Sequence, residues 1–394
     1  MVFEQRQCGV LMPVASLAGP YGIGSLGKSA ARFVDFLSRA GQSVWQILPL
    51  SPTSFGDSPY QSPSAFAGNP YFIDLDTLRR EGLLKKGEYE NEAYGANPRR
   101  VDYAALYETR YKVLRTAFER FSAWYPDDYY RFCWENRDWI EDYALFMTAK
   151  GLNGGRAYLE WEDEGLRLHK KEALDRLYAE HEKEVHFWKF LQYEFTRQWD
   201  ALHAYAKSKG VSILGDIPIY VSADSADVWA NRELFLLDEN GVPKDVAGCP
   251  PDYFSPDGQL WGNPLYAWDV HEKTKFAWWV RRIRFALAQF DSLRIDHFRG
   301  FDTYYAIPYG SVNAVTGEWR HGPGMKLFSE VRRQLGDVPI VAEDLGDLCD
   351  SVYALLRDSG FPGMKVLQFA FDAPGESEYQ PHTYPRNCVA YPGT

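Results

Sequence analysis

The segment from Thr274 to Gly300 restricts the fold of this chain more than any other part of the sequence. Its first half has apolar side chains at helical spacing: Phe276, Val280, Ile283, Leu287 and Phe290. Its second half is a short apolar alternation that ends in Asp296, between Arg294 and Arg299. A helix, a tight turn and a strand with charged residues at its carboxyl end form one unit of an α/β barrel, and such barrels carry their chemistry at that end. The alternative is a purely structural ion pair between Asp296 and one of the arginines.

The same alternation of helix and strand recurs along the chain. The predicted strands are Cys8–Pro13, Val44–Leu48, Val211–Asp216, Leu293–Asp296, Ile340–Ala342, Met364–Phe369 and Cys388–Tyr391. The predicted helices between them are Lys28–Ala40, Phe187–Lys207, Thr274–Phe290, Met325–Leu335 and Leu348–Ser359. Strands that mostly follow helices predict an α/β fold, a (β/α)₈ TIM-type barrel that lacks its eighth strand in this chain.

Two long stretches interrupt this alternation. Residues 78–186 are polar, charged and aromatic, and they predict an inserted helical subdomain in which Tyr103–Trp124 and Asp138–Lys150 are the clearest helices. Residues 220–271 predict a second insertion of active-site loops. The division that we expect is therefore one catalytic barrel domain over residues 1–394, with two insertions.

Composition and charge exclude several classes of protein. The chain is 45% hydrophobic and 25% charged, as globular proteins usually are, and a net charge of −11 without a long basic run argues against nucleic acid as a partner. No run of 18 apolar residues predicts a membrane span, and residues 1–13 lack the pattern of a signal peptide. Five scattered cysteines without a C-x-x-C pair favour free thiols in a reducing compartment, so we expect a cytoplasmic location: Cys8, Cys133, Cys249, Cys349 and Cys388.

Three acidic residues, Asp216, Asp296 and Glu343, each end a predicted strand. All strands of a parallel barrel point the same way, so these carboxylates should converge at one end of the barrel. A retaining glycosidic mechanism needs two such groups, a nucleophile and an acid, about 5–5.5 Å apart. Arg294 lies on the same strand face as Asp296 and should keep it ionised, whereas neighbouring acids should raise the pKa of Glu343.

Two other kinds of site fit these patterns less well. Strand-end acids can bind metals, but a metal site would prefer histidine beside them and only His297 qualifies, so we expect neither a metal nor an organic cofactor. The run Gly22-Ile-Gly24-Ser-Leu-Gly27 matches the G-x-G-x-x-G pattern of dinucleotide-binding enzymes. Eight residues separate it from the preceding strand, and the next strand ends at Pro49 without an acid to hold a ribose, so its context argues against a dinucleotide site.

The loop at residues 57–71 follows the second predicted strand and is rich in Ser, Pro, Gly and aromatic residues. Its simplest interpretation is a proline-stiffened surface loop. At the mouth of a barrel it would also form a lip that binds sugar, and the aromatic content of 16% suits a site that stacks the flat faces of sugar rings.

Together these segments resemble the 4-α-glucanotransferases, the amylomaltase group of the α-amylase-like retaining enzymes, from about residue 8 to the last residue. The resemblance rests on residues 57–71, 214–220, 293–300 and 342–346, and on the run Pro250-Pro251-Asp252-Tyr253-Phe254-Ser255. The Pro-Pro-Asp-Tyr-Phe run separates this group from ordinary amylases.

The resemblance implies a reaction and a set of residues. A segment of an α-1,4-glucan passes to the 4-hydroxyl of another glucan or of glucose by a retaining double displacement, with maltooligosaccharides and α-glucans as partners. Asp296 is implied as the nucleophile and Glu343 as the acid and base. Further residues are implied in substrate binding: Tyr60, Asp216, Arg294 and His297 at the point of cleavage, and Trp261 and Asp252 in a loop that covers the acceptor side.

The sequence departs from the family pattern at one place. The family has a third catalytic carboxylate, in a His-Asp-Asn run after the seventh strand, whereas this sequence ends at Gly393-Thr394. We therefore expect the third acid and the eighth strand to be absent from this chain, and residues 1–394 to bind glucan weakly if at all and not to catalyse transfer. The alternatives are an α-amylase-type hydrolase and an inactive glucan-binding fragment.

Overall fold

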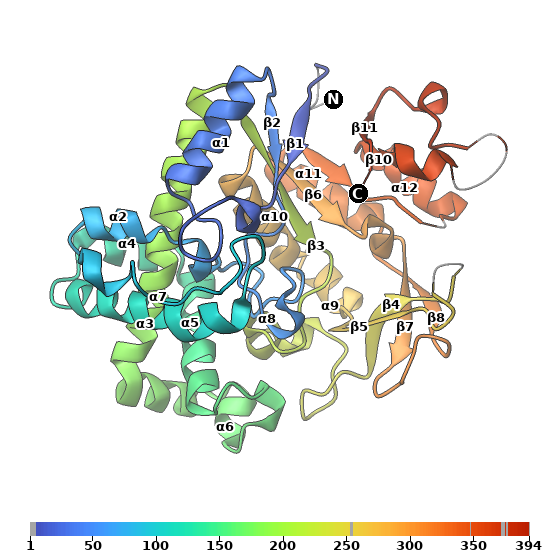
Figure 1. The fold of residues 1–394 in the computed structure, drawn as a ribbon. Coiled ribbons are helices and arrows are strands. Elements are labelled where there is room, and N and C mark those ends of the chain that lie inside the picture. The colour runs from blue at the N-terminus through green and yellow to red at the C-terminus, as the bar shows by residue number, and fades with distance from the viewer. Residues whose placement is uncertain (1–4, 253–254, 347, 372–374, 376, 394) are drawn as a thin grey trace.

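The computed structural model describes residues 5–252, 255–346, 348–371, 375 and 377–393. Seven strands form two parallel sheets (Figure 1), with β1 (Gly9–Leu11), β2 (Val44–Gln46), β3 (Ser212–Pro218), β6 (Ser292–Asp296) and β9 (Ile340–Ala342) in one and β10 (Gly363–Val366) and β11 (Cys388–Tyr391) in the other. Five of them pair in the order β1-β2-β3-β6-β9, and β10 pairs with β11. A strand therefore forms at each of the seven predicted places, and within the described residues no ladder joins β9 to β10 or β11 to β1.

The strands curve around a shared interior. Leu214 of β3, Val341 of β9 and Met364 of β10 form one buried cluster, although other strands separate β3 from β10. The Tyr391 hydroxyl of β11 donates to the side chain of Gln46 of β2 at 2.8 Å. Contacts between strands that are not neighbours require a curved sheet, because side chains on one face of a flat sheet reach only adjacent strands.

The helices are α1 (Lys28–Arg39), α2 (Leu75–Arg80), α3 (Tyr103–Phe121), α4 (Asp127–Glu135), α5 (Arg137–Leu152), α6 (Glu164–Arg167), α7 (Lys171–Ser208), α8 (Ala226–Ala230), α9 (Trp268–Lys273), α10 (Ala277–Gln289), α11 (Met325–Leu335) and α12 (Asp350–Ser359). Among them, α1, α7 and α10 contact β2, β3 and β6. Within the described ranges, no helix combines the length and the apolar character that a membrane crossing requires.

The expected boundary of the helical insertion at residue 186 falls inside α7. The sequence predicted a separate helix at Phe187–Lys207, but α7 starts at Lys171 and passes through one non-helical residue, His181 (φ −131°, ψ 29°). Its first part is mostly charged and buries little besides Ala173 and Leu177, so its apolar periodicity was too weak to reveal a helix. The insertion therefore continues into a helix of the barrel without a break.

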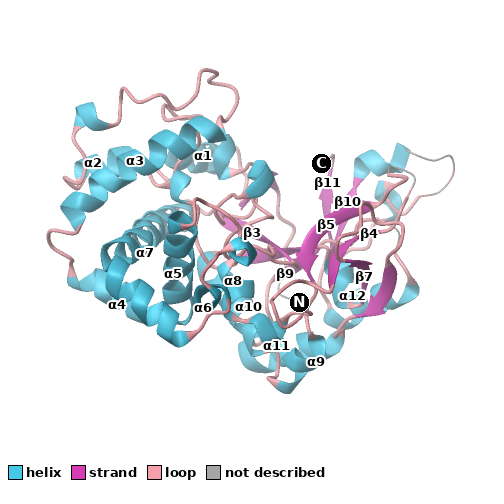
Figure 2. Ribbon diagram, turned by 90° about the horizontal axis from the view of Figure 1, so that it is seen from below, coloured by secondary structure: helices cyan, strands magenta, loops and turns pink. Residues whose placement is uncertain are grey.

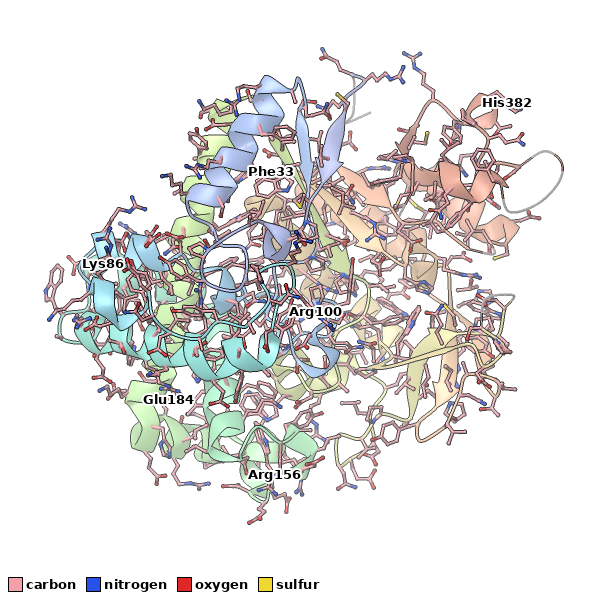
Figure 3. All side chains as sticks on the ribbon, in the orientation of Figure 1. Phe33, Lys86, Arg100, Arg156, Glu184 and His382 are labelled. Carbon is pink, nitrogen blue, oxygen red and sulfur yellow. The ribbon has the colours of Figure 1, made fainter. Side chains whose placement is uncertain are left out.

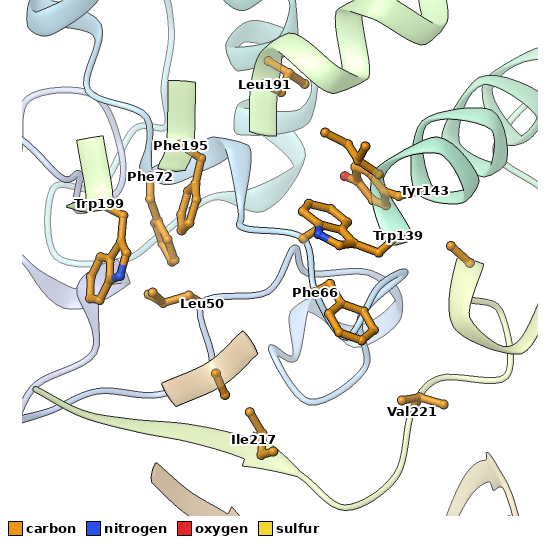
Figure 4. Close-up of a cluster of buried hydrophobic side chains, with 14 of the residues drawn as sticks. Leu50, Phe66, Phe72, Trp139, Tyr143, Leu191, Phe195, Trp199, Ile217 and Val221 are labelled. Atoms are coloured by element: carbon orange, nitrogen blue, oxygen red, sulfur yellow. The ribbon is translucent and has the colours of Figure 1, made fainter. Parts of the chain in front are cut away.

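An aromatic core joins the helical insertion to the barrel. In Figure 4, Trp139 and Tyr143 of α5 lie on one side of Phe66, and Ile217 of β3 lies on the other. The Phe66 ring stacks on Trp139 with centroids 6.3 Å apart. Exposed side chains such as Lys86 and Arg156 project from the outer side of the insertion (Figure 3).

The region 220–271, which the sequence predicted as loops, contains two strands. These are β4 (Asp245–Cys249) and β5 (Gln259–Pro264), and they join β7 (Thr303–Pro308) and β8 (Glu318–His321) in an antiparallel sheet of order β5-β4-β7-β8 beside the barrel (Figure 2). Glycines and prolines inside β4 and β5 concealed them, because both residues are rare in strands. This sheet was missed entirely by the sequence analysis.

Two predicted boundaries are also wrong. The helix expected from Thr274 begins at Ala277, because Lys275 and Phe276 both have left-handed backbone angles (φ 53°) that interrupt an α-helix. The strand expected to reach Phe369 ends at Val366, where the chain turns into a short 3₁₀ helix, Leu367–Phe371.

The glycine run before α1 has a structural role, which contradicts its interpretation as a dinucleotide site. A Cβ at Gly24 would lie 1.8 Å from the carbonyl oxygen of Val14, and one at Gly27 would lie 2.1 Å from the Asp74 carboxylate. Ser25 also donates to that carboxylate, at 2.9 Å. The start of α1 therefore faces a protein carboxylate, which would repel the pyrophosphate of a dinucleotide.

Candidate active site

Strand register brings three charged residues together at the carboxyl ends of β3 and β6. Asp216 of β3 pairs in register with Arg294 of β6, so their side chains leave the same face of adjacent strands. Arg294 Nη1 donates to Asp216 Oδ1 at 2.8 Å and to Oδ2 at 2.9 Å, and Arg294 Nη2 donates to Asp296 Oδ1 at 2.6 Å. One guanidinium group thus binds two carboxylates, as its fork of donors allows.

The two carboxylates on Arg294 differ in access to solvent. The side chain of Asp296 is 34% exposed, whereas that of Asp216 is 1% exposed. Burial raises the pKa of Asp216 to about 6, although the charge of Arg294 opposes that shift. Asp296 is therefore the carboxylate that a ligand can reach. Asp216 binds Arg294, which in turn donates to Asp296.

Tyr60, in the loop at residues 57–71, completes this cluster. Its hydroxyl donates to Asp216 Oδ2 at 2.7 Å, and burial raises its pKa above the ordinary value, so the phenol stays protonated. The loop is anchored further along, where the Ala65 N–H donates to Asp227 and the Gly68 N–H to Gln192, each at 2.7 Å. These bonds explain why a loop without regular structure places Tyr60 in a fixed position.

Glu343 follows β9 and is bound to the backbone next to Asp296. Its Oε2 accepts from the main-chain N–H of His297 at 2.8 Å, and its Oε1 accepts from that of Leu345 at 2.8 Å. Burial raises the pKa of Glu343 to about 7, and the negative charge of Asp296 acts in the same direction, against Arg294 and the two N–H donors. The predicted rise in the pKa of Glu343 therefore has burial as its main cause.

His297 adopts a left-handed backbone conformation (φ 57°, ψ 50°), which costs energy for a residue other than glycine. The turn aims its ring between Trp261 and Tyr220, with centroid distances of 4.8 Å and 6.3 Å. Burial lowers the pKa of His297 to about 3, so the imidazole is neutral. Its Nε2 is buried without a hydrogen-bond partner among the described residues, which leaves it available to a ligand hydroxyl.

Trp261 and Asp252, the two residues expected over the acceptor side, differ in position. Trp261 of β5 meets the His297 ring edge-on at 87°. Asp252 lies on the exposed turn between β4 and β5, where its Oδ1 accepts from the Ser255 N–H at 2.7 Å. Tyr253 and Phe254 of the same motif lie outside the described residues.

The sequence analysis missed two residues that connect parts of the site. Gln61 Nε2 donates to the Trp261 carbonyl at 3.2 Å and to Asn263 Oδ1 at 3.0 Å, so it ties the 57–71 loop to β5. Tyr220 packs against both Trp261 and His297. The position of Gln61 directly after Tyr60 was the only available signal for it, because β5 had not been predicted.

The charged groups of this site are two carboxylates bound to one guanidinium group, with Glu343 beside them. Among the residues that the structure describes, no group of three or more His, Cys, Asp or Glu side chains is arranged to hold a metal ion. Arg294 is the cation between the acids, and one neutral imidazole and one phenol lie beside them. Such a set suits a neutral, hydroxyl-rich ligand, with one accessible carboxylate and one carboxyl group that titrates near neutrality.

Comparison with known proteins identifies relatives over nearly the whole chain. A family model described as 4-alpha-glucanotransferase matches residues 12–394. A 4-alpha-glucanotransferase of Clostridium butyricum is 48% identical over 384 residues, which are 97% of this chain and 79% of the relative. One from Thermus thermophilus is 48% identical over 395 residues, 99% of this chain and 78% of the relative.

The fold has solved counterparts as well. An amylomaltase from Streptococcus agalactiae, solved in complex with acarbose, superposes with a TM-score of 0.97 at 45% identity, over 99% of this chain and 79% of that one. An amylomaltase from Corynebacterium glutamicum has a TM-score of 0.76 at 19% identity, over 100% of this chain and 55% of that one, and supports the fold alone. These matches confirm the predicted class, an α/β protein of the TIM-barrel type.

Proposed function

This chain belongs to the 4-alpha-glucanotransferase family, and from that premise we propose that Asp296 is the nucleophile and Glu343 the acid and base of its reaction. The reaction transfers a segment of an α-1,4-glucan to the 4-hydroxyl of another glucan or of glucose. One observation carries the assignment. Arg294 donates to the accessible Asp296 at 2.6 Å, while burial raises the pKa of Glu343 to about 7. A retaining pair needs one ionised and one protonated carboxyl group.

In the first step, an oxygen of Asp296 forms a bond to the anomeric carbon while the bond from that carbon to the glycosidic oxygen breaks. Glu343 gives its proton to the departing oxygen, so the leaving segment is released as a neutral alcohol. The ion pair with Arg294 keeps Asp296 in the carboxylate form that attacks. The product of this step is a glycosyl–enzyme ester on Asp296 and an ionised Glu343.

In the second step, the 4-hydroxyl of an acceptor sugar attacks the same carbon, and the bond to Asp296 breaks. Glu343, now ionised, takes the acceptor's proton and returns to its starting state. The two N–H donors on Glu343 stabilise the ionised form between the two steps. Protons and bonds therefore balance over the cycle, and each glycosidic bond that breaks is replaced by a new one.

We assign substrate binding to the groups around this pair. His297 Nε2, which is buried and has no hydrogen-bond partner among the described residues, is the group that we expect to bind a sugar hydroxyl. Tyr60 and Asp216 form the polar wall beside it, and Trp261 offers an aromatic face on the acceptor side. We assign Asp252 to the same side on family resemblance alone, and expect it to bind substrate only if the exposed turn closes over the acceptor.

Maltooligosaccharides are the substrates that we propose, and the cytoplasm is the location, on the basis of the scattered cysteines. An α-amylase-type hydrolase would share the first step, but the relatives that cover 97–99% of this chain carry the glucanotransferase name. These relatives do not support hydrolysis, or glucan binding without turnover, better than they support transfer.

Incubation with maltotriose tests the proposal. Transfer should give glucose together with a series of longer maltooligosaccharides, and Asp296→Asn should abolish the series. Products limited to glucose and maltose would favour a hydrolase. A product series that persists in Asp296→Asn would contradict the assignment of the nucleophile while leaving the transfer activity in place.

A further inference from the structure

The antiparallel sheet beside the barrel has an exposed tryptophan on its edge strand. The register places Leu260, Gly248, Tyr305 and Trp319 in one row across β5, β4, β7 and β8, so these residues share a face of the sheet. Tyr305 is buried under the loop that precedes β8, where its hydroxyl donates to the Ala314 carbonyl at 3.0 Å. Trp319 stands at the end of the row, and it is 43% exposed.

Two neighbours hold the Trp319 ring in one orientation. The guanidinium carbon of Arg299 lies 4.1 Å from the centroid of the ring, and Tyr305 contacts the ring edge-on at 5.1 Å. A cation over one face and an aromatic edge against the ring both favour a fixed indole. The exposed part of Trp319 is therefore a rigid, flat, apolar surface.

Polar residues adjoin Trp319 and Arg299 in the register of β7 and β8 and in the chain. Arg299 Nη2 donates to Thr303 Oγ1 at 3.4 Å, and Thr303 lies opposite His321 in the β7–β8 ladder. At the start of α12, the Ser351 hydroxyl donates to Asp302 Oδ2 at 2.7 Å. A flat apolar surface near residues that carry hydroxyl, carboxylate and imidazole groups suits a glucose unit, which has an apolar ring face and an equatorial belt of hydroxyls.

Arg299 connects Trp319 to the strand that carries Asp296. Arg299 follows Asp296 by three residues, in the 3₁₀ turn Phe298–Phe301 that leaves the end of β6. On the other side of the sheet, Trp261 of β5 reaches His297. A polymeric substrate bound at Asp296 has further glucose units on both sides of the cleaved bond, and these units must lie on the protein surface near the site.

We propose that Trp319, supported by Arg299, is a remote binding platform for a distal glucose unit of a long α-glucan. The proposal rests on the proposed function, because it concerns how the same substrate is held away from the bond that is cleaved. Binding energy from such a remote contact benefits only substrates long enough to reach it. The platform therefore favours long glucans over short maltooligosaccharides.

The helical insertion supplies a matched control. Trp134 of α4 is 68% exposed, and the Arg137 guanidinium stacks on its ring at 4.3 Å. This pair has the same composition as the Trp319–Arg299 pair, but it lies in the helical insertion, with Trp134 on α4 and Arg137 at the start of α5. Comparison of the two sites separates the effect of position from that of an exposed tryptophan in general.

The test measures kcat/KM for amylose and for maltotriose in Trp319→Ala, Trp319→Tyr and Trp134→Ala. Loss of one aromatic stacking contact should lower kcat/KM for amylose about fivefold in Trp319→Ala, since aromatic contacts of this kind correspond to changes of that order. Values for maltotriose should stay within about twofold of the wild type, because the remote contact is beyond its reach. Trp319→Tyr should retain most of the activity on amylose, and Trp134→Ala should match the wild type on both substrates.

Three results would overturn the proposal. They are an unchanged kcat/KM for amylose in Trp319→Ala, an equal loss on both substrates, and an equal loss of amylose activity in Trp134→Ala. Sedimentation velocity of the same variants tests another occupant, since dissociation of an oligomer in Trp319→Ala would assign this surface to a second copy of the chain instead. If neither residues 1–394 nor a version extended by a homologous C-terminal segment converts maltotriose, the proposed function fails, and that outcome is distinct from each of these.

Discussion

The main-chain N–H of His297 donates to Glu343 Oε2 at 2.8 Å, so the residue after the proposed nucleophile holds the proposed acid. Two further bonds link the same segments, from the Glu343 N–H to Ile295 O and from the Phe298 N–H to Glu343 O, each at 3.0 Å. The ends of β6 and β9 are therefore locked to each other. The relative position of the two carboxyl groups depends on backbone geometry, which makes the site rigid before substrate binds.

Replacement of Glu343 by Gln should abolish transfer from natural glucans and spare the first step with a maltosyl fluoride donor. Loss of a general acid typically costs about 10²–10⁴ in rate, and fluoride leaves without a proton. Fluoride release and glucose release measure the two cases. Glu330→Gln on α11 is the control, because Glu330 pairs with Arg333 on the surface. Equal loss with both donors would argue against an acid role for Glu343.

The pKa of Glu343 predicts a pH dependence of the first step. The acid must be protonated, and its pKa is raised to about 7, so kcat/KM for a natural glucan should fall as the pH rises through about 7. With maltosyl fluoride this decline should disappear. A decline at the same pH with both donors would place the titrating group elsewhere.

Replacement of Arg294 by Lys should lower kcat/KM about 10²- to 10³-fold, a loss typical for one preorganised charged group. A single ammonium group cannot bind Asp216 and Asp296 at once as the guanidinium fork does. Arg320→Lys is a matched control, because Arg320 also joins two carboxylates, Asp245 and Glu318, each at 2.8 Å. Similar activity losses in both lysine variants would indicate a general effect on stability.

Replacement of Trp261 by Ala should shift the second step from transfer toward hydrolysis. The indole covers the His297 ring, so its removal opens the glycosyl–enzyme to water and weakens binding of the acceptor. Transfer conserves the number of reducing ends, whereas each hydrolysis adds one, so a reducing-sugar assay on maltotriose measures the ratio directly. Trp261→Phe should restore the ratio toward that of the wild type. A slower enzyme with an unchanged ratio would show that Trp261 does not exclude water.

Glu194 of α7 should make stability depend on pH. Its Oε1 accepts from Arg197 at 2.9 Å, its Oε2 is buried without a partner among the described residues, and burial raises its pKa to about 7. The unfolded chain releases this proton near the ordinary pKa of 4.5 and the folded chain only near 7, so the group costs stability increasingly as the pH rises between these values.

Glu194→Gln should therefore raise the free energy of unfolding by roughly 1–3 kcal/mol at about pH 8, and by little at about pH 4.5. Thermal melting at both pH values measures the difference. Glu119→Gln on the surface of α3 should leave Tm unchanged at both. A gain in Glu194→Gln that is equal at the two pH values would mean that ionisation is not its cause.

The three carboxylates and Arg294 could be predicted from the sequence because each lies at or near the end of a predicted strand. Asp216, Asp296 and Glu343 follow apolar runs that predict strands, and parallel strands bring such ends together without knowledge of any contact. The periodicity of α10 and α11 was equally clear. Tyr60 and Asp216, which share a hydrogen bond, are 156 residues apart in the sequence, so family resemblance alone predicted that they lie in one site.

The antiparallel sheet shows the limit of this approach. Gly248 and Gly262 interrupt the pattern of their strands, and Leu260 and Trp319 are exposed where alternation would predict burial. Tertiary pairing with β7, and not local preference, forms β4 and β5. Gln61, Asn263 and Tyr220 depend on this sheet for their positions, so they could not be predicted without it.

The most direct test of the proposed mechanism is to trap the covalent intermediate. A 5-fluoro glycosyl fluoride slows the second step, so the sugar accumulates on the nucleophile, and peptide mass spectrometry locates it. The account predicts a single labelled peptide with the sugar on Asp296, and no label in Asp296→Asn. A sugar found on Asp216 or Glu343 would contradict it.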